Sequence, residues 1–353
     1  MNSAAGQKGF VFGGGAYLRD GKTAYALSIV DLDADQPVAT PLPVSFLVHG
    51  VVFDPTQPTR AALFEKKGPG ACVVDLQTRS VTRTIATPPT RRFYGHGAFS
   101  RDGRLLYATE SLLDHDLPGL LVVRDGQTLR EIGTLPTYGT APHDCVLIED
   151  GRTMVVANGG GPLGGAEPCV TYIDLSSERL LERVPLGAAR HNAGHVAVNA
   201  AGDLAIVSAP RDGLGRDALG AVTLRAAGRD AVTISRPHHA VRRMVGESLS
   251  VLIDDRDRTV LATHPLGDCV SVWRMDDASL VDLIEAYNPR GLAHSLDGAW
   301  LLVSHTTEDS VAISIYDAVS RQPTGRTIQP SFASGSHLFV HNLRAAQTVA
   351  PAP

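Results

Sequence analysis

The chain has 353 residues, a net charge of −5 and a hydrophobic content of 43%. No basic cluster stands out, so the sequence gives no electrostatic basis for binding nucleic acid. No apolar run approaches the roughly 18 residues of a membrane span, and none is expected. The length alone allows two domains, but all-β propellers often exceed the usual domain size.

The first nine residues have neither the charged region nor the apolar region of a signal peptide. The protein is therefore expected either in the cytoplasm or, where an export signal has been trimmed, in the periplasm.

A repeated unit runs along the chain, and such periodicity is informative about the whole fold. Each unit starts with a short strand led by a polar residue. A turn, often Asp-Gly as at Asp102-Gly103, leads into a second apolar strand, and a further β-rich run follows. The unit starts, at residues 49, 96, 143, 195, 247 and 290, are separated by 47, 47, 52, 52 and 43 residues.

A further unit is split between the two ends of the chain. Residues 337–343 have the form of the first strand, and residues 9–45 have the form of the outer strands. Pairing these segments would complete a blade and remove open sheet edges. The prediction is an all-β fold, a single seven-bladed β-propeller over residues 1–353, closed by pairing of the C-terminal strand with the N-terminal blade strands.

The first strand of each blade in a propeller faces the central channel, so the leading polar residues are expected at one height around it. Hydrophobic packing would not select imidazole at five of these positions. The seven residues are His49, His96, His143, His195, Glu247, Arg290 and His337.

Imidazole is the commonest protein ligand for iron, copper and zinc. We therefore expect the five histidines to be metal ligands. Glu247 is expected as a ligand, a base or a hydrogen-bond acceptor for a ring N–H. Arg290 can hold an anionic ligand or substrate through two parallel hydrogen bonds. A polar substrate pocket without metal and purely structural histidines are the alternatives.

The segment 92–110, RFYGHGAFSRDGRLLYATE, resembles the signature of an uncharacterised bacterial family, domain of unknown function 1513. Shorter matches lie at 48–51, 142–144, 155–160, 242–244 and 336–338. The resemblance implies a periplasmic protein with a twin-arginine export signal and an association with iron uptake. The sequence departs from the family pattern at two points: Asp144 stands where Glu is usual, and the export signal is missing.

The leading functional hypothesis is a metal-binding propeller, with iron favoured by the resemblance and copper or zinc allowed by the ligands. One alternative is a non-haem metal-dependent enzyme, oxygenase-like or lactonase-like, acting at the same channel mouth. Another is a metal-free platform for protein interaction. The expected partners are a metal ion or a small anionic ligand and periplasmic proteins, and the expected state is a monomer.

Overall fold

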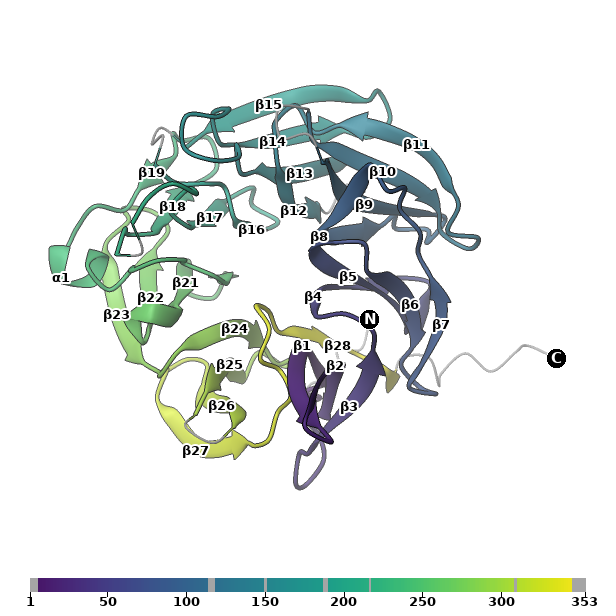
Figure 1. Cartoon of the computed structure of the whole chain (residues 1–353). Helices are drawn as coiled ribbons and strands as arrows, with labels where there is room; N and C mark the ends of the chain where they lie inside the picture. Colours follow the sequence, from purple (N-terminus) through teal and green to yellow (C-terminus); the bar gives the residue numbers. More distant parts are fainter. Residues whose placement is uncertain are drawn as a thin grey trace.

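The computed structural model describes residues 6–113, 118–148, 151–186, 190–215, 217–307 and 310–344. Within these ranges the chain forms small antiparallel sheets that follow one another in a ring around a central axis (Figure 1). The all-β prediction is confirmed, and the architecture is propeller-like. No described helix has the length and apolar character to span a membrane.

The sheet that joins the two chain ends has the order β28 (Phe339–His341), β1 (Phe10–Arg19), β2 (Lys22–Asp31) and β3 (Ala39–Val44). Phe10 of β1 lies opposite His341 of β28, and Phe12 lies opposite Phe339. This is the expected junction between the C-terminal and N-terminal strands. It gives β1 a hydrogen-bonded neighbour on the side that an open ring would expose.

Two four-strand units follow, and a pairing of β5 with β8 joins them into one eight-stranded sheet. The strands of the first unit are β4 (Val48–Asp54), β5 (Gln57–Gly68), β6 (Ala71–Asp75) and β7 (Ser80–Thr84). The strands of the second are β8 (Arg91–Phe99), β9 (Leu105–Leu112), β10 (Leu120–Asp125) and β11 (Glu131–Pro136).

The remaining sheets each contain four strands in sequence order. They comprise β12 (Pro142–Leu147), β13 (Thr153–Asn158), β14 (Cys169–Asp174) and β15 (Arg179–Pro185), then β16 (His195–Val198), β17 (Leu204–Ser208), β18 (Ala221–Arg225) and β19 (Val232–Thr233). The last two comprise β20 (Val251–Asp254), β21 (Thr259–His264), β22 (Cys269–Arg274) and β23 (Leu280–Glu285), then β24 (Pro289–His294), β25 (Trp300–Thr306), β26 (Val311–Asp317) and β27 (Pro323–Ile328). Short helical turns occur at α1 (His238–Val241) and η1 (Pro265–Gly267).

The core lies between neighbouring sheets. Side chains alternate between the two faces of a strand, so consecutive apolar residues can serve two interfaces. In β5, Leu63 belongs to the apolar cluster that includes Phe12, whereas the next residue, Phe64, packs with Phe93 of β8. Both faces of such a strand are buried, which explains the run of consecutive apolar residues in the second strand of the repeats.

One predicted inner strand was placed too early. The sequence suggested a strand over 247–251, but β20 begins at Val251. The ladder is interrupted before that point, where the backbone N–H of Ser250 donates to the hydroxyl of Thr263 (2.9 Å) and not to a carbonyl. The residues before β20, including Glu247, therefore form a loop.

Candidate metal centre

Three of the five histidines sit at irregular points of their strands. The pairing register shifts between Val48 and Gly50 in β4, between Phe93 and Gly97 in β8, and between Pro142 and Cys145 in β12. Each shift spans a histidine: His49, His96 or His143. A β-bulge turns a side chain away from its regular direction, and here it accompanies side chains that meet on the axis.

His195 and His337 reach the same point from different contexts. His195 is the first residue of β16 and lies in regular register opposite Val207. His337 lies two residues before β28, within the predicted segment 337–343 but ahead of the strand that forms. Among the described residues, one ring nitrogen from each of four histidines lies within 4.8 Å of the others. These four are His49, His96, His195 and His337.

His143 is the fifth imidazole at this point. Its ring centroid is 4.5 Å from that of His195 and 5.0 Å from that of His49. It is 5% exposed, and its Nε2 atom has no hydrogen-bond partner in the described structure. The five histidines selected by the sequence therefore lie together, which is the arrangement expected of them.

Hydrogen bonds at Nδ1 assign the tautomers of four rings. His143 Nδ1 lies 2.7 Å from the carbonyl oxygen of Tyr94, and His195 Nδ1 lies 2.6 Å from that of Leu249. A carbonyl oxygen can only accept, so both rings carry their proton on Nδ1. Nε2 in each ring is then an unprotonated lone pair.

The same tautomer follows for His96 and His337. His96 Nδ1 lies 3.1 Å from Oδ1 of Asp144, which is an acceptor as a carboxylate. His337 Nδ1 lies 3.0 Å from the Ser250 hydroxyl, which donates its own proton to the carbonyl of Ser336 and so accepts from the ring. Acceptors on the outer nitrogens of metal-bound histidines fix ring orientation in this way.

The result is a group of Nε2 lone pairs directed at one another. His337 Nε2 lies 2.9 Å from His195 Nε2, and both are unprotonated by the assignment above. His49 Nε2 lies 3.2 Å from His195 Nε2, and His96 Nε2 has no partner among the described residues. Buried polar atoms are normally paired, and a cation at this point would pair several at once.

Burial also keeps the imidazoles neutral. It lowers the pKa of all five rings below the ordinary value of 6.5, and neighbouring histidines lower it further at His49 and His195. At His96 the Asp144 carboxylate opposes this effect. Neutral imidazole is the form that binds metal, so no proton has to leave at pH 7.

Glycine at position 95 makes room for the centre. Its φ is +118°, a conformation that residues with a Cβ rarely adopt. A Cβ at Gly95 would lie 2.5 Å from Cδ2 of His49. The Gly-His pair at 95–96 is therefore required by the close approach of the His49 ring.

Glu247 and Arg290 lie at the edge of the centre. The Glu247 carboxylate is 3.7 Å from the Lys66 ammonium and its side chain is 41% exposed. Arg290 Nε donates to the carbonyl oxygen of Gly335 (3.1 Å). Neither belongs to the four-histidine group, so the structure does not bring Glu247 into contact with these ring nitrogens.

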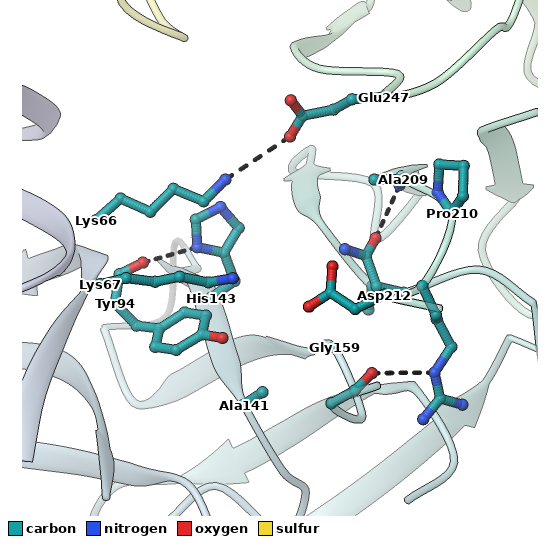
Figure 2. Close-up of a pocket in the computed structure, with 14 residues that line it drawn as sticks. Lys66, Lys67, Tyr94, Ala141, His143, Gly159, Ala209, Pro210, Asp212 and Glu247 are labelled. Atoms are coloured by element: carbon teal, nitrogen blue, oxygen red, sulfur yellow. Dashed lines mark hydrogen bonds and ion pairs between the residues drawn. The ribbon is translucent and has the colours of Figure 1, made fainter. Parts of the chain in front are cut away.

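Sequence reasoning missed several residues at the site. Lys66, Lys67 and Tyr94 line a pocket that also includes His143 and Glu247 (Figure 2). Their roles depend on contacts between strands far apart in sequence, and the sequence signal was limited to a Lys-Lys pair ahead of a Gly-Pro-Gly turn. Asp144 was visible beside His143, yet its contact is with His96 in the neighbouring sheet.

The solved structures that are similar to the chain include the following two. Kuenenia stuttgartiensis hydrazine synthase is 14% identical with a TM-score of 0.64, over 84% of this chain and 92% of that chain. Dihydro-heme d1 dehydrogenase NirN in complex with DHE is 14% identical with a TM-score of 0.63, over 95% of this chain and 75% of that chain. At such identity the likeness establishes only the propeller-like fold. Among curated proteins, no sequence matches the chain.

One family model does match, and its description is Protein of unknown function (DUF1513). The match covers residues 42–331, which include four of the five histidines and leave His337 outside. The resemblance seen in the segment 92–110 is thereby confirmed. Because the match extends over most of the sequence, the chain belongs to the DUF1513 family.

Proposed function

We propose that the protein binds a transition-metal ion on its central axis through His49, His96, His195 and His337, with His143 as a fifth imidazole donor. The observation that carries the proposal is the convergence of buried Nε2 lone pairs whose rings are already oriented by acceptors on Nδ1. Without a cation, these atoms face one another at 2.9 Å and 3.2 Å. With one, each would have a partner.

The donor set narrows the choice of metal. Neutral nitrogen ligands suit iron, copper and zinc, whereas magnesium and calcium prefer oxygen. Iron is our first choice because the family resemblance carries an association with iron uptake, and copper and zinc are the alternatives. The bound ion would be a Lewis acid or redox centre. The chain's own residues hold it, orient the rings and limit access of water.

The proposal also covers the number of blades and the cellular compartment. We propose that the eight-stranded sheet counts as two blades, which gives seven blades in one propeller over the whole chain. We also propose export to the periplasm, supported by the family resemblance.

Elemental analysis of the protein purified without a histidine tag tests metal binding. We expect one equivalent of metal after exposure to Fe(II), Cu(II) or Zn(II), followed by gel filtration. The double variant His96→Ala, His143→Ala should lose it. The matched control is His238→Ala, His239→Ala, since both of these histidines are exposed and lie on α1. Failure of the unmodified protein to retain any of the three metals would refute the proposal.

A further inference from the structure

A pocket of about 240 Å³ opens beside the histidine group. Lys66, Lys67, Tyr94, Asp212 and Glu247 line it together with His143 (Figure 2). His143 is thus shared between the pocket and the candidate metal centre. Its Nε2 has no hydrogen-bond partner in the part of the chain that the structure describes and is a donor to the metal ion proposed above, so a ligand in the pocket would lie next to that ion.

Two neighbouring lysines face this pocket, which a regular strand would not allow. Successive side chains of a strand point to opposite faces. Lys67 has a φ of +60°, and the pairing of β5 with β8 shifts between Lys66 and Gly68. This break in the alternation lets Lys66 and Lys67 line the same pocket.

The conformation of Lys67 has a cost, because a residue with a Cβ is strained at positive φ. Strain of this kind persists where the surrounding structure imposes it, and it concentrates at functional sites. The ammonium of Lys67 lies 5.7 Å from the centroid of the Tyr94 ring, within the pocket wall. The Lys66 ammonium is 3.7 Å from the Glu247 carboxylate.

The charges around the centre leave a bound ion uncompensated. The imidazoles are neutral, so they contribute no negative charge. Nearby cations are Lys66, Lys67, Arg211 and Arg290, and nearby carboxylates are Asp144, Asp212 and Glu247. Four positive and three negative side chains leave no net negative charge to balance a bound cation. The charge of a divalent or trivalent ion in this partly buried place would then need a counter-charge from outside the protein.

We infer that the pocket binds a small carboxylate anion, best a dicarboxylate, which supplies an oxygen ligand to the metal ion while Lys66 and Lys67 contact its other oxygens. The inference rests on the metal binding proposed above. Arg290 was the expected anion-binding residue, but it does not line this pocket. Lysine ammonium groups are suited to oxyanions as compact charges.

Copper-loaded protein provides the test, because the visible absorption of Cu(II) reports a change of ligand. Malonate is the probe, and malonamide is its neutral match in size and shape. Malonate should shift the absorption band in a saturable manner, and malonamide should not. Metal content after gel filtration shows whether the copper has stayed bound.

Variants then assign the shift to the pocket. Lys67→Met and Lys66→Met should each raise the half-saturating malonate concentration about tenfold. Lys22→Met, which removes an exposed lysine on β2, should leave it unchanged. Glu247→Gln removes a competing negative charge and should lower it several-fold. Circular dichroism checks that each variant is folded.

The outcomes separate the two proposals. Retained copper with no malonate shift, or with an equal shift for malonamide, overturns the anion site and leaves the metal site standing. A malonate shift that is the same in Lys66→Met, Lys67→Met and the unmodified protein also overturns it. A protein that binds no copper, iron or zinc refutes both.

Discussion

Replacing Asp144 by Asn should weaken metal binding although the residue is not in the four-histidine group. Both carboxylate oxygens accept hydrogen bonds: Oδ1 lies 3.1 Å from His96 Nδ1, and Oδ2 accepts from the backbone N–H of Val196 at 3.0 Å. An amide has one acceptor and one donor end, so it cannot satisfy both N–H groups. If its oxygen serves Val196, its NH₂ faces His96 and favours the tautomer with the proton on Nε2, which removes the lone pair from the centre.

The magnitude follows from the bond that is lost. A hydrogen bond to a charged group contributes about 1.5–3 kcal/mol, and removing a residue that orients a metal ligand costs roughly 10–100-fold in metal affinity. We expect Asp144→Asn to raise the Kd by that factor.

Competition with a chromophoric chelator measures the Kd. Asp144→Glu, which keeps two acceptor oxygens, is the matched variant and should lose less affinity. An unchanged Kd in Asp144→Asn, with the fold intact, would refute the tautomer argument.

Three further predictions concern packing, pH and metal removal. Gly95→Ala should displace the His49 ring, since the new Cβ would lie 2.5 Å from its Cδ2. We expect at least a tenfold loss of metal affinity in the same competition assay. Equal affinity in the variant and the unmodified protein would contradict this prediction. Burial lowers the pKa of His264 from 6.5 to about 3, so the neutral ring makes its full contribution to stability above pH 6.5 and loses it as the pH falls toward 3. At pH 5 the loss is about 2 kcal/mol. Urea unfolding gives the free energy of unfolding of the unmodified protein and of His264→Gln. The difference between the two should be about 2 kcal/mol smaller at pH 5 than at pH 7.5, and a constant difference would count against the prediction. Metal at 100 times its Kd should stabilise the folded protein by about 2.7 kcal/mol, which calorimetry would detect as a rise in Tm reversed by a chelator; identical melting with and without metal would oppose it.

The strand pattern and the histidine set could both be predicted from the amino-acid sequence. The repeat spacing placed His49, His96, His143, His195 and His337 at matching positions, and repeated units stack in a regular way, so equivalent residues meet on the axis. The apolar runs at the second strands also follow from burial on both faces. These features depend on local pattern and repetition, which a single sequence displays.

The contacts that set the chemistry of the site depend on the folded arrangement of the whole chain. The tautomer of His96 depends on Asp144, and that of His195 depends on the carbonyl of Leu249, which is 54 residues away. Lys67 faces the pocket because its φ is positive, and no residue type in the segment predicts that angle. Hydrogen bonds between neighbouring blades and single dihedral angles are set by the packing of the whole ring, so they are not encoded in a local pattern.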